Sequence, residues 1–151
     1  MNAFLLSIHV LAAILAIGPV AVAASMFTSA ARLASDDPKK AVTLQVLHRT
    51  TRVYAVIGVL VPVFGLATGA RMGVLGDTWL IVSLILTVAA AGILVGFILP
   101  GQKRVVDALG SEQKSVSSAR LGMTTGIFNL LWAVVVVLMI YRPGSTTGVG
   151  L

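Results

Sequence analysis

The 151-residue sequence contains no cysteine, so disulfide bonds, thiolate metal sites and cysteine nucleophiles are excluded. Charged residues are also scarce, at 11% of the chain, whereas a soluble domain carries roughly 25%. The sequence has neither a phosphate-binding loop nor the Gly-x-Ser-x-Gly motif of serine hydrolases. The chain therefore falls outside the soluble class, and its motifs argue against a conventional hydrolase.

Acidic residues are few, and all of them lie outside the long apolar stretches or at their edges. They are Asp36, Asp37, Asp77, Asp107 and Glu112. Because ion-coupled pumps normally carry carboxylates within their spans, a conventional transporter is not expected. The net charge of +6 comes from basic residues beside apolar stretches, a pattern typical of topology signals and lipid headgroup contacts. We expect the lipid bilayer as a partner, and no nucleic acid.

Apolar sequence is abundant, since 58% of the residues are hydrophobic. A helix needs about 20 apolar residues to cross the hydrocarbon core of a membrane. Four stretches free of Asp, Glu, Lys and Arg reach or approach this length: residues 4–27, 53–70, 79–99 and 125–141. They predict an all-α fold, a transmembrane four-helix bundle formed by a single domain of residues 1–142. The Gly- and Thr-rich residues 143–151 are expected to form a flexible tail.

The basic residues predict the orientation of this bundle. Nine of the eleven lie in the connections after the first and third spans, and the other two are Arg71 and Arg142. Because cytoplasmic loops carry the excess of Lys and Arg, we expect those two connections in the cytoplasm. Both termini are then expected outside.

Local signals predict that helices 2–4 extend beyond the membrane on the cytoplasmic side. Pro38 is expected at the first position of the second helix, which is expected to end at about Met72. The third helix continues through Gln102–Leu109, with a kink or break at Pro100. The residues expected to cap helix N-termini are Asp37, Asp77 and Ser111.

Three spans contain pairs of glycines four residues apart, which let helix backbones approach closely in lipid. These helix-packing residues are Gly65 and Gly69, Gly92 and Gly96, and Gly122 and Gly126. One interpretation is packing within the bundle. The other is that one such face forms a homo-oligomer or docks the protein into a larger membrane complex.

Apart from two tyrosines, His9 is the only ionisable side chain within the four spans, and an ionisable residue in a span is by default a functional candidate. It lies roughly 7–8 Å below the outer end of its helix and about level with residue 66 of the second helix. Ala12, Ala13 and Ala16 leave space beside its ring. The imidazole can ligate haem iron or another metal, or it can simply bond a neighbouring carbonyl or reach the headgroups.

The second histidine, His48, is expected about 18 residues away along the second helix, or roughly 27 Å. It therefore cannot share an iron with His9 and is interpreted as a solvated or headgroup-facing residue. A second axial ligand to haem would have to be Met72, Met139 or His9 of another subunit, or the position stays open. Asn129 is expected to bond across helices.

The stretch Ser7-Ile8-His9-Val10-Leu11-Ala12-Ala13, followed by Gly18, resembles the first helix of the bacterial CopD-like and HemJ-like membrane proteins. The closest resemblance is to the uncharacterised predicted integral membrane protein families grouped with them. Residues 52–69 are similar to the second helix of those proteins. The HemJ type is associated with protoporphyrinogen oxidation and the CopD type with copper handling. The resemblance implies a multi-pass protein of the bacterial plasma membrane whose His9 ligates haem b or helps to bind a metal.

Three hypotheses follow from these observations. The leading one is a small integral membrane protein that binds haem b through His9 as a redox accessory protein. The second is a structural subunit of a larger membrane complex. The third is a membrane oxidase acting on a porphyrin or a quinone.

Overall fold

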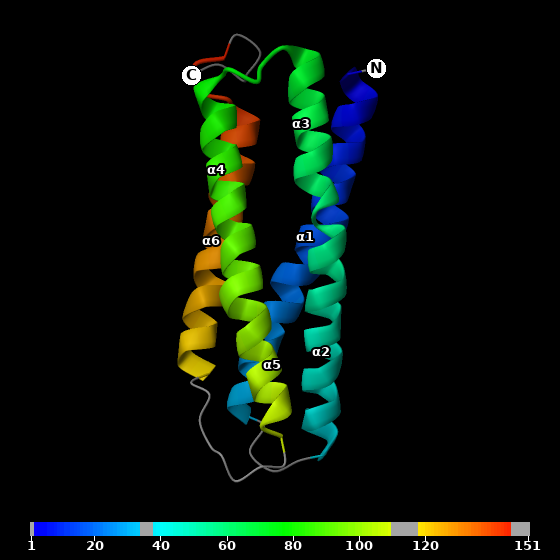
Figure 1. Cartoon of the computed structure of the whole chain (residues 1–151), viewed down its shortest axis with the longest axis vertical. Coiled ribbons are helices and arrows are strands. Elements are labelled where there is room, and N and C mark those ends of the chain that lie inside the picture. The colour runs from blue at the N-terminus through cyan, green and yellow to red at the C-terminus, as the bar shows by residue number, and fades with distance from the viewer. Residues whose placement is uncertain (1, 34–37, 110–117, 146–151) are drawn as a thin grey trace.

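The computed structural model describes residues 2–33, 38–109 and 118–145, and nearly all of these residues are helical (Figure 1). The elements in chain order are α1 (Asn2–Leu33), α2 (Pro38–Ile57), α3 (Leu60–Met72), α4 (Thr78–Ile93), the π-helical η1 (Leu94–Ile98), α5 (Leu99–Asp107) and α6 (Ser118–Tyr141). They form four units long and apolar enough to cross a membrane: α1, α2 with α3, α4 through α5, and α6. The expected all-α bundle of four transmembrane helices is confirmed.

The helices are longer than the apolar stretches from which they were predicted. The second begins at Pro38 and ends at Met72, as expected, and Gly73 ends it in the left-handed conformation that glycine adopts without strain. The expected caps Asp37 and Ser111 lie outside the described residues, as do residues 146–151 of the tail. The start of α1 and the end of α6 lie at the same end of the bundle (Figure 1). We call this the termini end and the opposite one the basic end.

The second membrane unit is interrupted between α2 and α3. Pro62 has no N–H to donate to the carbonyl of Gly58, four residues earlier. That carbonyl instead accepts from Val61 at 3.1 Å, and Val59 donates to Val56 at 3.2 Å, so the turn tightens locally. The chain resumes its helix at Leu60, and the two helices remain one continuous apolar unit.

Pro100 does not break the third unit, which is helical from Thr78 to Asp107. The wider turn of η1 precedes it, and the N–H of Leu99 donates to the carbonyl of Leu94, five residues back. A π-turn inserts one residue into the helical repeat. The helix therefore accommodates the missing N–H of Pro100 by a local change of helical pitch and does not break.

The buried core lies away from the termini end. Its larger cluster, joining α1, α4, η1 and α6, contains Val20, Ala24, Ala90, Leu94, Ile98 and Phe128. A second cluster at the basic end contains Phe27, Leu44 and Leu121. Toward the termini end, α1 packs on α3 and α4 packs on α6, whereas α3 and α4 make few contacts with each other. This uneven packing leaves an open space between the two helix pairs.

Candidate cofactor site

A cavity of about 690 Å³ occupies the termini half of the bundle and is lined by residues of α1, α3, α4 and α6. Ligand sites typically measure about 300–1,000 Å³ and are mostly apolar with a few placed polar groups. The walls here are mainly Leu, Ile, Val, Ala and Pro side chains. Among the residues that the structure describes, only His9 and Arg142 bring an ionisable group to this lining.

His9 forms part of the α1 wall and is 8% exposed. Its Nδ1 lies 2.9 Å from the carbonyl oxygen of Val61 on α3. Because a carbonyl only accepts, Nδ1 must carry the proton, and Nε2 then holds the free lone pair. The bond to a neighbouring carbonyl, one of the roles expected for His9, is therefore present. It does not use Nε2, the atom that a metal would need.

Gly65 lies directly against the imidazole. A Cβ at this position would be 2.9 Å from Cε1 and 3.2 Å from Nδ1 of His9, closer than real contacts allow. The expected level of His9, near residue 66, is thus correct. Gly65 was expected to pack helix against helix, and it does so by admitting the His9 ring. Gly69 similarly leaves room for Leu80 of α4, whose Cδ2 would lie 3.0 Å from a Cβ there.

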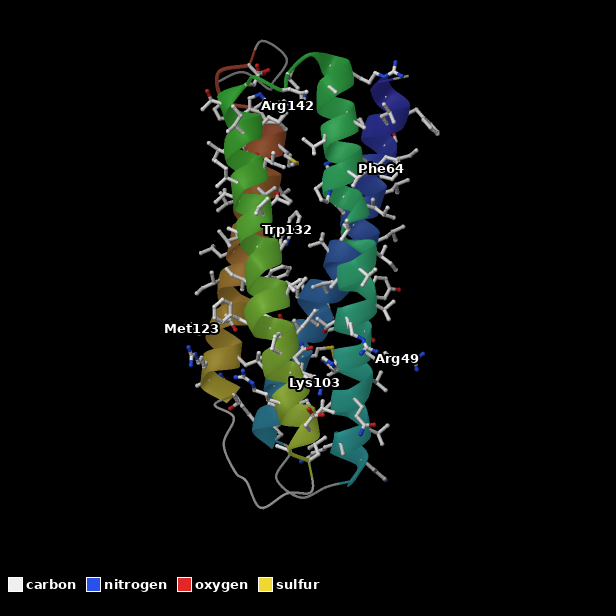
Figure 2. The ribbon with its side chains drawn as sticks, viewed as in Figure 1. Arg49, Phe64, Lys103, Met123, Trp132 and Arg142 are labelled. Carbon is white, nitrogen blue, oxygen red and sulfur yellow. The ribbon has the colours of Figure 1, made fainter. Side chains whose placement is uncertain are left out.

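Arg142 lies at the termini end of the cavity, where Figure 2 labels it. Its guanidinium carbon is 5.4 Å from the ring centroid of Trp79, and its Nε donates to the Met139 carbonyl at 3.2 Å. Within the described residues it is the only non-glycine with positive φ, at 45°. This conformation costs on the order of 1 kcal/mol or more for a residue with a side chain.

Trp79 is held in turn by Asp77, whose Oδ2 accepts from the indole Nε1 at 3.0 Å. Asp77 occupies the N-cap position of α4, as expected, but its side chain makes no capping hydrogen bond. Asp77 therefore occupies the predicted N-cap position, but the prediction that its side chain caps the helix is wrong. The Asp77 carboxylate instead orients the indole ring of Trp79, over which the Arg142 guanidinium lies.

Sulfur and indole groups also line this cavity. Met72 of α3 and Met139 of α6, both candidates for a second axial ligand, line the same cavity as His9. Trp132 lies near mid-height of the bundle (Figure 2) and packs edge-on against Phe128 at 6.4 Å between centroids. Its Nε1 is buried without a partner among the described residues. An unpaired buried donor costs free energy unless a ligand or water accepts from it.

The remaining paired glycines behave differently from Gly65 and Gly69. A Cβ at Gly92, Gly96 or Gly126 would meet nothing within 4 Å, and Gly122 faces the guanidinium of Arg32 at 3.2 Å. Gly92, Gly96 and Gly126 therefore bring no two helices of the described bundle into close contact, whereas Gly122 of α6 leaves room for a side chain of α1.

His48 is neither solvated nor directed at headgroups, contrary to expectation. It is half-buried at the basic end, where its Nδ1 lies 3.1 Å from Oε1 of Gln102 on α5. Gln102 is fully buried and also donates to Thr51 at 3.3 Å. A buried Gln needs hydrogen-bond partners for both its amide oxygen and its amide nitrogen. The His48 ring is the partner of the oxygen. His48 is absent from the cavity lining, as expected from its distance to His9.

Asn129 does bond across helices, donating from Nδ2 to Ser25 of α1 at 3.1 Å. Its Oδ1 is buried without a partner among the described residues. The bond joins α1 to α6 outside the cavity lining.

The donor set of the cavity suits one kind of metal cofactor. Within the described residues no three His, Asp or Glu side chains gather to hold a bare ion, which would need three or four protein ligands. A porphyrin brings four nitrogens to its iron and needs one axial imidazole. A metal-ligating histidine usually donates its other N–H to a carbonyl or carboxylate, as His9 does to Val61.

Two residues of this site were missed from the sequence. Arg142 was interpreted only as a topology charge, and Trp79 was assigned no role in a site. The available signal was positional, because both residues stand at the outer limits of predicted spans. Nothing in the sequence indicates that the α6 terminus would turn Arg142 back over the cavity.

Four apolar helices enclosing one mostly apolar cavity define a small multi-pass integral membrane protein. Residues 3–143 match the family described as Predicted integral membrane protein (DUF2269), and the chain belongs to this family. No curated protein and no solved structure matches the chain. The expected membership of a predicted integral membrane protein family is confirmed, while the likeness to the CopD-like and HemJ-like groups stays a resemblance.

Proposed function

We propose that this integral membrane protein binds haem b in the cavity of its termini half and serves as a redox accessory protein. The observation that carries the proposal is the hydrogen bond from His9 Nδ1 to the Val61 carbonyl. It fixes the tautomer in which Nε2 keeps a free lone pair, in the wall of a cavity of about 690 Å³. A bound haem would supply a one-electron redox centre.

The surrounding residues fit this cofactor. The apolar walls exclude water from a macrocycle, and the hydrogen bond to Val61 prevents the imidazole from rotating. Met72 and Met139 provide thioethers in the same cavity, and a thioether is a known second axial ligand of haem. Either methionine would supply that second ligand, or the sixth position would stay open.

An absorption spectrum of the purified protein tests the proposal directly. Protein produced with ample haem, or titrated with haemin in detergent, is expected to show a Soret band at a haem-to-protein ratio near one. The band is expected to shift on reduction with dithionite, as the band of a bound haem does. Protein that stays colourless under both conditions would rule the function out.

A second candidate is a structural role in a membrane assembly, favoured by Gly92 and Gly96. Both are exposed on the third membrane unit, and nothing within the described chain would contact a Cβ at either position. Paired small residues of this kind commonly form helix–helix contacts in lipid. A second copy of the chain is the simplest partner for such a face.

Substituting Gly92 and Gly96 together by leucine is expected to weaken self-association, because the added side chains keep the two helix backbones apart. Cross-linking in membranes or analytical ultracentrifugation in detergent measures the dimer fraction. Gly18→Leu is the matched control, since Gly18 of α1 is equally open. A wild-type protein that is monomeric at all concentrations, or equal loss in the control, contradicts the assembly role.

A further inference from the structure

The termini end of the cavity combines three features that the haem ligand does not explain. A cation lines an otherwise apolar cavity, a Trp–Asp pair supports that cation, and the backbone at this residue is strained. The cation is Arg142, and strain at a functional residue persists only where the surroundings hold it in place. Here the strained turn brings a charged side chain over the cavity instead of releasing it to solvent.

The donors of Arg142 are largely unused. Its Nε donates to the Met139 carbonyl, but the two terminal amino groups have no acceptor among the described residues. The nearby carboxylate of Asp77 is bonded to Trp79 and forms no ion pair with Arg142. A guanidinium that is packed on an indole and left unpaired is ready to bind a carboxylate through two parallel hydrogen bonds.

The cavity is deep enough to hold an apolar body between the two ionisable groups. Along α3, seven residues separate Gly65, which contacts the His9 ring, from Met72 at the termini end, or about 10 Å of helical rise. Along α6, ten residues separate Trp132 from Arg142, or about 15 Å. An occupant that reaches His9 therefore has an apolar middle and can place an anionic edge at Arg142.

We infer that Arg142 is an anion-binding residue that orients the occupant of the cavity by pairing with its carboxylates, the propionates of a porphyrin. The inference rests on the proposed function for the identity of the occupant, but its chemistry is independent of iron. Charge complementarity selects a molecule with an apolar body and carboxylates at one edge. The pairing directs that edge toward the termini end and the rest of the macrocycle toward His9.

The test compares metal-free protoporphyrin IX with its dimethyl ester, followed by fluorescence with the protein in lipid nanodiscs. The wild-type protein is expected to bind the free acid at least about tenfold more tightly, since esterification removes the charge that the guanidinium pairs with. Arg142→Gln is expected to bring this ratio close to one, and Arg142→Lys to restore part of it. Because the ratio is compared between variants, differences in membrane partitioning of the two probes cancel.

Arg71→Gln is the matched control. Arg71 stands in the last turn of α3 at the same end of the bundle, is exposed, and does not line the cavity. Its removal changes the net charge equally and is expected to leave the ratio unchanged. A wild-type ratio near one, or equal changes in Arg142→Gln and Arg71→Gln, overturns the inference. Complete displacement of bound protoporphyrin by an equal concentration of oleate reassigns the site to a lipid and overturns it as well.

The result is separable from that of the haem proposal, because a metal-free porphyrin has no iron for His9 to ligate. A colourless protein that still prefers free-acid protoporphyrin through Arg142 refutes haem binding and supports the anion site. A Soret band with no dependence on Arg142, for haem or protoporphyrin, supports haem binding and refutes the anion site.

Discussion

Replacing His9 by alanine is expected to abolish the Soret band that haem gives with the wild-type protein. The imidazole is the only nitrogen ligand lining the cavity among the described residues, and its loss leaves the iron without a strong axial donor. Removal of an outer hydrogen-bond partner of a metal ligand costs roughly 10- to 100-fold in affinity, and removal of the ligand itself costs more. Haemin titration of purified protein, monitored by absorbance, measures the loss.

Two variants make this result specific. His48→Ala removes the other histidine of the chain, which is bonded to Gln102 at the basic end, and is expected to leave the Soret band unchanged. His9→Gly with added imidazole is expected to restore the band, because the cavity next to residue 9 admits a small ligand. A Soret band in His9→Ala as strong as in the wild type would show that haem binds elsewhere.

The sequence predicted the architecture well because the bilayer leaves few alternatives. Apolar stretches of the right length must become helices, since lipid offers no partners for an open backbone. The same stretches predicted the level of His9 opposite residue 66, as the rise per residue is constant. The limits of the first helix were less accurate, because α1 begins at Asn2 and ends at Leu33, beyond the apolar residues 4–27.

The site was only partly predictable, since its features depend on which side chains meet. His9 could be identified as exceptional, but the acceptor of its N–H follows from how α1 crosses α3, which no local pattern encodes. Pro100 was expected to disturb its helix, yet η1 accommodates it with a π-turn. The positive φ of Arg142 is likewise a tertiary effect, because an isolated helix terminus would favour glycine there.

Gly65 has a second role besides the helix packing that its motif predicted. Its pairing with Gly69 predicted close helix packing, and α1 does approach α3 closely at this point. The contact, however, is between the glycine and the imidazole ring. A residue identified from a packing motif is therefore also the support of the candidate ligand. This distinction decides what a substitution at Gly65 should do.

Gly65→Ala is expected to weaken haem binding on the order of tenfold or more while the protein stays folded. The new methyl group would lie 2.9 Å from Cε1 of His9, so the ring must move. It cannot move freely, because Nδ1 is bonded to Val61, one turn earlier on the same helix. Overpacking of this kind typically costs about 1–3 kcal/mol, and every 1.4 kcal/mol changes a binding constant about tenfold.

Gly92→Ala provides the matched control, since the same methyl group at Gly92 meets nothing within 4 Å. Both variants add one methyl and raise helix propensity equally, so a difference between them reports the contact with His9. The comparison uses haemin affinity together with the thermal unfolding midpoint of the apo-protein. Equal haemin affinities of the two variants would contradict a fixed His9 ring. A lower affinity confined to Gly65→Ala would show that the orientation of His9 governs ligation. A glycine in a packing motif then determines how the histidine on the facing helix presents its Nε2.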